Sequence, residues 1–334
     1  MNIAFAGFRH GHIFVLYEMA KNHKDYNIVG AFEEELNARS SAEEKGVTFN
    51  YSTYRALLED KSVEVVAIGS AYGDRGQMAI EALKAGKHVI CDKPLCTSLF
   101  ELDEIESISK EKGLTVSCMF TMRFEKKIVA VKNLVQSGKL GKINNVYFGG
   151  QHPLQYGRRP AWYFEKGKHG GVINDIAIHG IDVLSFVFGG KVKTINGARC
   201  WNAYAKDEPE FLDSAQFMLT LEKGAGVIAD VSYAIPDGVE FKLPYYWQFF
   251  IWGTEGMIGF SLSEKQFKSG GEEQPAFYYV KGNSEPIPLE EGEADNYLTD
   301  FLRVVRGESG QILPMSDVIS STRSTLEIQN KANK

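Results

Sequence analysis

The chain has 334 residues, of which 44% are hydrophobic and 24% charged, and its formal net charge at pH 7 is −6. This length exceeds that of one ordinary hydrophobic core, so we expect two domains. The acidic balance argues against nucleic acid or an anionic membrane as partner, and no stretch approaches the roughly 20 apolar residues that span a bilayer. The first residues have the pattern of a buried strand rather than a signal peptide, and the four cysteines lack zinc-type spacing. We therefore expect a cytoplasmic protein with reduced thiols.

The first 120 residues alternate short apolar runs with helical patterns. Five runs rich in Val, Ile and Phe predict strands buried on both faces: 2–6, 26–32, 63–69, 87–91 and 114–120. Helices are expected between them, at 11–22, 37–45, 76–85 and 98–112. This alternation is typical of a parallel, doubly wound sheet, so residues 1–120 are predicted to form an NAD(P)-binding Rossmann domain.

A short loop follows the first expected strand. It consists of Gly7, Phe8, Arg9, His10, Gly11 and His12. In a Rossmann fold this loop brings the backbone close to the cofactor pyrophosphate at the start of the first helix. Only Gly7 fits the G-x-G-x-x-G spacing, so the loop alone is weak evidence for a dinucleotide. We assign the loop to cofactor binding, with Arg9 able to place positive charge near a phosphate; the alternative is that Arg9 and His10 are simply exposed.

An acidic residue follows the second expected strand. Glu33 lies about 20 residues beyond the loop, where an acid normally accepts hydrogen bonds from the adenosine ribose hydroxyls. Its charge would also repel the 2′-phosphate of NADP, so we expect NAD, with NADP less favoured. Ser70 and Ala71, which follow the third expected strand, are assigned to the same cofactor site.

A lysine follows the fourth expected strand, in the run AGKHVICDKPL at 85–95. Ligands of such folds bind in the crevice at the carboxyl ends of the strands, where Lys93 stands. A lysine on a surface is ordinarily solvated, but this position makes Lys93 a candidate for catalysis and for cofactor contact. Pro94 makes the turn rigid, and an X-Pro bond at such a turn can be cis.

Beyond residue 120 the pattern changes. Helices are expected at 126–137, 170–189, 296–306 and 315–330, and strands at 144–151, 192–201, 214–221, 226–233, 246–252 and 257–260. Gly, Pro and Asp turns join most of these strands, as in antiparallel sheets. Residues 121–334 are therefore predicted to form an α+β domain for substrate binding and oligomerisation, with a large, open, mostly antiparallel sheet. The C-terminal helix is a candidate to pack back on the Rossmann domain.

The expected helix at 170–189 carries polar residues on one stripe of an otherwise apolar sequence. Asp175 and His179 are four residues apart and share a helix face, with Asp182 three further along. Asn174 has the character of an N-cap, which would place Asp175 in the first turn. A lone histidine is usually a satisfied core residue, but the accompanying acids weaken that explanation. Other histidines are too scattered to argue for zinc, so we expect no metal.

These segments together resemble the glucose–fructose oxidoreductase, inositol dehydrogenase and MocA (Gfo/Idh/MocA) family, nearly end to end. The resemblance rests on the glycine turn, the Ala-Gly-Lys-His-Val run into Lys-Pro, and the Gly-Gly…Asp…His…Asp helix. It implies that Lys93, Asp175 and His179 form the catalytic group and that Arg123 lies on the substrate side. Asp92 stands where the family has Glu, and the glycine loop departs from the family pattern.

The predicted function is hydride transfer between a nicotinamide cofactor and a secondary hydroxyl of a sugar, inositol or related polyol. Imidazole titrates near neutral pH, which suits His179 as general acid and base. Lys93 would stabilise negative charge on the reacting oxygen, Asp175 would orient the substrate or the lysine, and the nicotinamide supplies the hydride chemistry.

Two further features remain open. Tyr156 and Trp162 belong to an aromatic and basic stretch, 156–164, that forms either a sugar-stacking wall or a packed loop, and residues 245–247 allow the same two interpretations. The resemblance also implies a homodimer or homotetramer formed across the open face of the sheet. We therefore expect half of four apolar strand residues to face away from the helices of their own domain. The set is Phe217, Met218, Phe249 and Phe250.

Two other functions would use the same motifs. One is an NAD-dependent glycoside hydrolase that works by transient oxidation. The other is a non-catalytic NAD-binding sensor, against which the complete set of Lys93, Asp175 and His179 argues.

Overall fold

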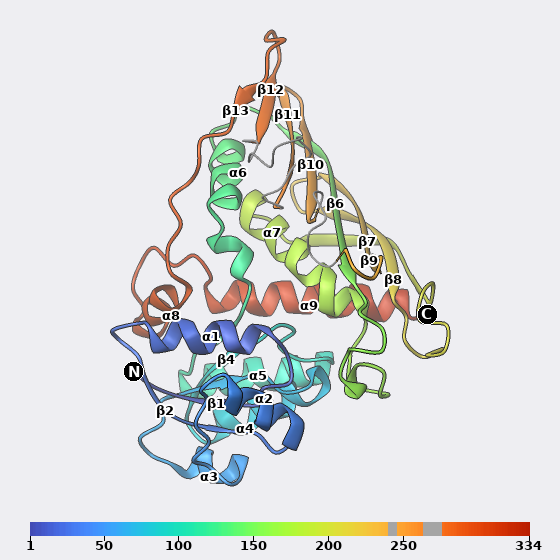
Figure 1. Ribbon diagram of the computed structural model, residues 1–334. Helices are drawn as coiled ribbons and strands as arrows, with labels where there is room; N and C mark the ends of the chain where they lie inside the picture. Colours follow the sequence, from blue (N-terminus) through green and yellow to red (C-terminus); the bar gives the residue numbers. More distant parts are fainter. Residues whose placement is uncertain (240–245, 263–275) are drawn as a thin grey trace. The chain divides into compact units, whose positions relative to one another are not determined.

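The computed structural model describes residues 1–239, 246–262 and 276–334, which divide into two compact units (Figure 1). Unit 1 comprises Met1–Phe120, Pro160–Gly170 and Asn296–Thr322. Unit 2 comprises Thr121–Arg159, Gly171–Asp295 and Arg323–Lys334. The assignment of residues 1–120 to a cofactor domain and 121–334 to a substrate domain stays a prediction.

Unit 1 contains a five-stranded parallel sheet in the order β2-β1-β3-β4-β5. The strands are β1 (Asn2–Ala6), β2 (Asn27–Phe32), β3 (Val65–Ile68), β4 (His88–Cys91) and β5 (Val116–Cys118). The central strand β3 has no exposed surface at any residue. Such continuous apolar runs are required where helices cover both faces of a sheet. The predicted parallel, doubly wound sheet is confirmed.

Helices connect the strands of unit 1. They are α1 (His12–Lys21), α2 (Leu36–Glu44), α3 (Tyr54–Glu59), α4 (Tyr72–Lys84) and α5 (Leu99–Lys112), with α8 (Tyr297–Arg306) and the first part of α9 (Met315–Ala332) from the end of the chain. Helix α5 begins with a capping box between Ser98 and Glu101 and ends at Gly113 in the left-handed conformation. Helix α3 was not predicted, because six residues are too few for a helical period; the Thr53 hydroxyl caps it.

Unit 2 is built on an eight-stranded sheet in the order β13-β12-β11-β10-β6-β9-β8-β7. The strands are β6 (Ile143–Pro153), β7 (Val192–Trp201), β8 (Ser214–Leu221), β9 (Gly226–Ile235), β10 (Gln248–Gly253), β11 (Gly256–Ser261), β12 (Phe277–Val280) and β13 (Ile287–Pro288). Only the β6–β9 pair among these is parallel, so the predicted mostly antiparallel sheet is confirmed. Helices α6 (Lys126–Gln136) and α7 (Ile178–Phe188) lie against one face of it (Figure 1).

Side chains of the large sheet alternate between this helix-covered face and an open face. Phe217 and Phe249 are 2% and 1% exposed, whereas their neighbours Met218 and Phe250 are 51% and 36% exposed. The period of two follows from the pleat of a strand. Half of the four apolar residues singled out from the sequence therefore face away from the helices, as expected.

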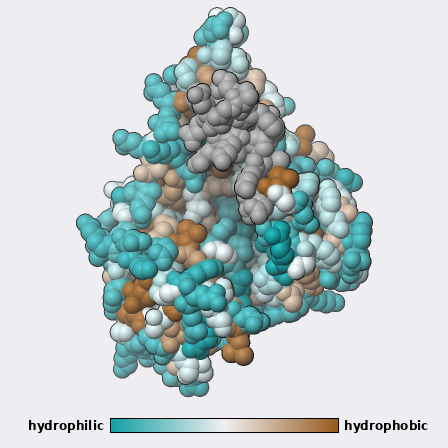
Figure 2. All heavy atoms as spheres, viewed as in Figure 1, coloured by the Kyte–Doolittle hydropathy of each residue, from teal (hydrophilic) through white to brown (hydrophobic). Residues whose placement is uncertain are grey.

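All four cysteines are free. Burial, partly offset by the nearby Arg75, raises the pKa of Cys91 to about 12, so its thiol is protonated at neutral pH. In the described ranges no helix combines the length and the apolar character needed to cross a membrane. The face shown in Figure 2 is mostly hydrophilic, with hydrophobic side chains in small groups.

Candidate active site

The glycine loop of unit 1 is tied to the ends of two neighbouring strands. The Gly7 N–H donates to the Phe32 carbonyl and the Arg9 N–H to the Gly69 carbonyl, both at 2.9 Å. Gly7 has a φ of 84°, and a Cβ on it would lie 2.5 Å from the backbone nitrogen of Ser70. Only glycine can occupy this position. Gly11, in contrast, precedes α1 with open space beside it.

Glu33 is buried against the loop. Its carboxylate accepts hydrogen bonds from the Phe8 N–H at 2.6 Å and from Nε of Arg9 at 2.8 Å, and also from the Glu35 N–H at 2.8 Å. Arg9 is therefore neither a solvated loop residue nor a free cation for phosphate, because Glu33 balances its charge. Phe8 is 3% exposed and its ring packs in the core beside Phe5, so Phe8 contributes only its backbone to the surface of the loop.

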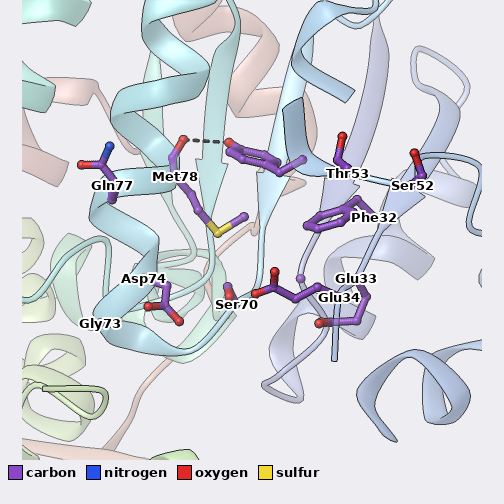
Figure 3. A pocket seen from close by; sticks show the side chains of 12 residues that line it. Phe32, Glu33, Glu34, Ser52, Thr53, Ser70, Gly73, Asp74, Gln77 and Met78 are labelled. Atoms are coloured by element: carbon purple, nitrogen blue, oxygen red, sulfur yellow. Dashed lines mark hydrogen bonds between the residues drawn. The ribbon is translucent and has the colours of Figure 1, made fainter. Parts of the chain in front are cut away.

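A cavity of about 400 Å³ opens beside Glu33 (Figure 3). It lies at the carboxyl ends of β1, β2 and β3, where ligands bind in such sheets. The lining residues are Gly7, Phe32, Glu33, Glu34, Ser52, Thr53, Tyr54, Ser70, Gly73, Asp74, Gln77 and Met78. Glu34 is the most exposed of the three acids that line this cavity, with a 75% exposed side chain. Carboxylates and hydroxyls around an apolar floor fit an adenosine, whose ribose offers hydroxyl donors. Ala71, also assigned to the cofactor from the sequence, precedes α4 and is buried.

Lys93 lies at the end of β4, in a turn held by a buried arginine. Arg75 of α4 has no exposed surface, and its guanidinium donates to the carbonyls of Ser70 at 2.8 Å and Asp92 at 2.9 Å, as well as to that of Lys93. It also pairs with the Asp92 carboxylate at 3.0 Å. Lys93 itself is 3% exposed, and the following peptide bond to Pro94 is cis. Sequence reasoning missed Arg75, since it lies within a helical pattern and charged residues are usually exposed.

Asp92 also contacts both histidines of the glycine loop. Nδ1 of His10 lies 2.7 Å from Oδ2 of Asp92, and Nδ1 of His12 lies 3.2 Å from Oδ1. Each of the three side chains offers one atom that could ligate a metal ion, and these atoms lie within 4.8 Å of one another. The Asp92 oxygens, however, already accept from Arg75 and from the imidazoles. The histidine pair therefore joins the glycine loop to the turn that contains Lys93.

An aromatic cluster from a distant segment belongs to the same unit. The hydroxyls of Tyr72 and Tyr163 lie 2.9 Å apart, and the ring of Trp162 lies 4.9 Å from that of Tyr72. Nζ of Lys93 lies 5.6 Å from the Tyr72 ring centre. Within the described residues the buried Nε1 of Trp162 has no hydrogen-bond partner, which makes it a donor available to a ligand. Trp162 is thus near Lys93, whereas Tyr156 belongs to unit 2 and is 39% exposed.

Asp175 and His179 of unit 2 lie on consecutive helical segments. Asp175 belongs to a π-helical turn (Ile173–Ala177), a form often found at functional sites, and His179 to the following α7. The expectation that Asn174 caps this helix is wrong. The side-chain oxygen of Gln329 accepts from the N–H groups of Ile173 at 2.9 Å and Asn174 at 3.3 Å, so the cap comes from α9.

Aromatic residues of the large sheet surround this helix. The hydroxyl of Tyr233 on β9 donates to Oδ2 of Asp175, and the ring of Trp247 lies 5.5 Å from that of His179. Asp175 and His179 are 2% and 6% exposed. Tyr233 was not predicted, since nothing local marks it among the strand tyrosines.

A second aromatic pair lies beside Trp247. The Tyr246 hydroxyl is 3.0 Å from Nε2 of His152, whose ring is 5.5 Å from that of Trp247. Burial raises the pKa of Tyr246 above its ordinary value. Of the three residues at 245–247 singled out from the sequence, the first lies outside the described ranges.

Arg123 of unit 2 is committed to an ion pair. Its Nε and Nη2 lie 2.8 and 2.7 Å from the two carboxylate oxygens of Asp182 on α7, and both side chains are 1% exposed. This bidentate pair holds α7 to the chain before α6. A substrate contact by Arg123 stays a prediction and would require the pair to open.

Two family models match the chain. A model described as an oxidoreductase family with an NAD-binding Rossmann fold matches residues 1–120, and the GFO/IDH/MocA C-terminal domain matches residues 128–259. The parallel sheet and the glycine loop of unit 1 agree with the match of residues 1–120 to a family with an NAD-binding Rossmann fold. The chain belongs to the Gfo/Idh/MocA family.

Relatives of known sequence or structure agree with this assignment. The chain is 27% identical to the oxidoreductase YrbE of Bacillus subtilis over 65% of its length and 61% of that protein. It is 28% identical to the myo-inositol 2-dehydrogenase of Thermotoga maritima over 51% of its length and 49% of that protein. The alignments thus span less than two thirds of either relative. The solved NAD-binding protein from Listeria innocua has the same fold, with a TM-score of 0.80 over 99% of this chain and 94% of that one, at 21% identity.

Proposed function

We propose that the protein is an NAD-dependent dehydrogenase that oxidises a secondary hydroxyl of a sugar, inositol or related polyol. The observation that carries the proposal is the buried Lys93 at the end of β4, in a turn held by Arg75, at the same edge of the sheet as a cavity suited to adenosine. Family membership and the similarity to a myo-inositol 2-dehydrogenase support the same class of reaction.

Each proposed role follows from the chemistry of the side chain. Lys93 donates a hydrogen bond to the substrate oxygen and stabilises the charge that develops as the hydroxyl loses its proton. His179 takes that proton as general base. Asp175, itself held by Tyr233, orients the substrate or the lysine. A bound nicotinamide would supply the hydride chemistry.

A substrate screen tests this function. Inositols, aldoses, amino sugars and sugar acids are offered with NAD, and NADH is followed by absorbance at 340 nm, its ordinary absorption band. Net NADH formation supports the dehydrogenase. Release of an aglycone from a glycoside without net NADH would instead establish the hydrolase, and NAD binding without turnover on any class would favour the sensor.

NAD is expected to bind about tenfold or more tightly than NADP. Two of the three carboxylates that line the cavity, Glu33 and Glu34, would lie near the 2′-phosphate of NADP, and like charges brought together in this way disfavour binding. Titrating the tryptophan fluorescence with each cofactor measures the ratio. Substituting both acids by glutamine should reduce the preference, whereas Glu44→Gln on the exposed side of α2 should not. Tighter binding of NADP by the unaltered chain would contradict the assignment.

We expect a homodimer or homotetramer formed through the open face of the large sheet. Met218 and Ile228 are cross-strand partners there, 51% and 58% exposed, beside a surface hollow of about 560 Å³. Exposed apolar patches of this kind usually mark interfaces. Met218→Glu should therefore reduce the mass measured by light scattering. Phe100→Glu, on a 77% exposed helix residue of unit 1, is the control. A monomeric unaltered chain at micromolar concentration would rule out this assembly.

A further inference from the structure

The two ring nitrogens of His10 have different surroundings, and one of them is fixed by Asp92. Nδ1 lies 2.7 Å from Oδ2 of Asp92, which has no exposed surface. Burial alone would raise the pKa of Asp92, but Arg75 and the neighbouring histidines hold it well below its usual range. The carboxylate is therefore ionised and only accepts hydrogen bonds, so Nδ1 of His10 carries the hydrogen.

The other nitrogen, Nε2, is then a hydrogen-bond acceptor. Burial lowers the pKa of His10 from 6.5 to about 4, against the opposing effect of Asp92. The ring is neutral at pH 7, and with its one hydrogen on Nδ1 it has a lone pair on Nε2. Within the described residues, no side chain or backbone group donates to this nitrogen. The cofactor loop thus presents an acceptor that the protein does not use.

The Asp92 carboxylate that fixes this tautomer is itself held in place. Nη2 of Arg75 pairs with Oδ2 of Asp92 at 3.0 Å, and Nη1 donates to the Asp92 carbonyl at 2.9 Å. The ring of His10 also packs edge-on against Tyr72, with centres 5.4 Å apart. Rotation of the imidazole would break a charge-assisted hydrogen bond, so its orientation is set before any ligand arrives.

The strand order places His10 on the side away from the adenosine cavity. That cavity is lined from the ends of β1, β2 and β3, whereas Asp92 follows β4, which lies beyond β3 in the sheet. A dinucleotide in a Rossmann fold crosses the carboxyl edge of the sheet from one half to the other. With adenosine at the β2 side, groups next to Asp92 face the nicotinamide half.

We propose that Asp92 and Arg75 are positioning residues that hold His10 as an uncharged acceptor for a donor on the nicotinamide half of the cofactor. The donor is a ribose hydroxyl or the carboxamide NH₂, because both offer hydrogens to a lone pair. The pyrophosphate is excluded, since its oxygens are themselves acceptors at neutral pH. This inference rests on the proposed binding of NAD.

Affinities for three probes test the contact. His10→Phe keeps a flat ring but removes the acceptor, and should weaken NAD binding about 5- to 20-fold while changing ADP binding less than about twofold. ADP keeps the adenosine and pyrophosphate only. His10→Gln, whose side-chain oxygen can take the place of Nε2, should restore most of the NAD affinity. If His10→Phe also binds ADP-ribose more weakly, the donor is the ribose hydroxyl. If its affinity for ADP-ribose is unchanged, the donor is the carboxamide. His88→Phe, at the opposite end of β4, is the matched control.

Two results would overturn the contact. Equal losses for ADP and NAD would place His10 at the pyrophosphate, and unchanged NAD affinity in His10→Phe would remove the contact altogether. Failure of the proposed function can be told apart from failure of this contact. If Lys93→Ala leaves turnover unchanged, the catalytic assignment fails. The His10 contact still stands if His10→Phe weakens NAD binding and not ADP binding.

A second measurement needs no cofactor. Two-bond ¹H–¹⁵N spectra at pH 7 should show His10 as the neutral Nδ1–H tautomer, with shifts unchanged down to about pH 5. The charged or titratable groups that face the ring are Asp92, His12, Lys93 and the phenol of Tyr72. Asp92→Asn should allow the Nε2–H tautomer, whereas Asp300→Asn, at another buried carboxylate of unit 1, should not. A charged ring or the Nε2–H tautomer in the unaltered protein would overturn the positioning role.

Discussion

Replacing Lys93 by alanine or methionine is expected to lower turnover by about two to four orders of magnitude, while NAD binding and folding are retained. This is the usual effect of removing one group that stabilises charge on a reacting oxygen. His179→Ala should have an effect of the same size, as the loss of an acid–base group does. It should also flatten the acid limb of the pH–rate profile, because oxidation needs the neutral imidazole. Steady-state kinetics with NAD titrations measure both effects.

A second buried lysine, at the other end of β4, provides the control. Lys87 precedes β4, is 7% exposed, and donates to the carbonyls of Asp60 at 2.7 Å and Val63 at 2.8 Å. Lys87→Met should lower the melting temperature and leave turnover nearly unchanged. Near-normal turnover in the variants of both Lys93 and His179 would show that the reaction takes place elsewhere.

The second large effect concerns stability. Asp182→Ala should lower the free energy of unfolding by about 3–5 kcal/mol, because it leaves the guanidinium of Arg123 buried without its carboxylate. Replacing both partners by Met and Leu should recover most of that loss, since the apolar pair leaves no unpaired charge. Urea unfolding of these two variants measures both effects. Glu59→Ala, which breaks the exposed pair with Arg55, should leave the free energy of unfolding nearly unchanged.

A further variant, Arg123→Met, decides between two roles for Arg123. If it is structural, Arg123→Met lowers the free energy of unfolding and leaves KM for the substrate near its normal value. If it binds substrate, KM rises by about tenfold or more and stability is retained. A rise in KM without any loss of stability would contradict the structural role.

Local patterns in the sequence were enough to predict the parallel sheet and the polar positions of the candidate site. Strands such as β3 are continuous apolar runs, and Lys93 follows one of them. The partners of these residues could not be predicted, because they come from distant parts of the chain. Tyr233 reaches Asp175 across 58 positions, and Gln329 caps Asn174 across 155. Such contacts are set by tertiary packing, for which a single sequence carries no local signal.

Arg9 is another residue whose partner could not be predicted from the sequence. Its charge suggested a phosphate contact, and the structure pairs it with Glu33, an acid that sequence reasoning had assigned to the ribose. Spacing assigned both residues to the region of the glycine loop, but spacing could not show that the two neutralise each other.

The discontinuous make-up of both units has a consequence for biosynthesis. Domains usually fold in order as they leave the ribosome, the N-terminal one first. Here the Tyr26 hydroxyl donates to the Leu298 carbonyl, and Ser117 hydrogen-bonds Tyr297, so the first sheet needs residues made near the end of translation. The helix with Asp175 receives its cap from Gln329, later still. Neither unit can complete its native contacts until its last segment is made, and a premature stop before Asn296 leaves both units incomplete rather than one finished domain.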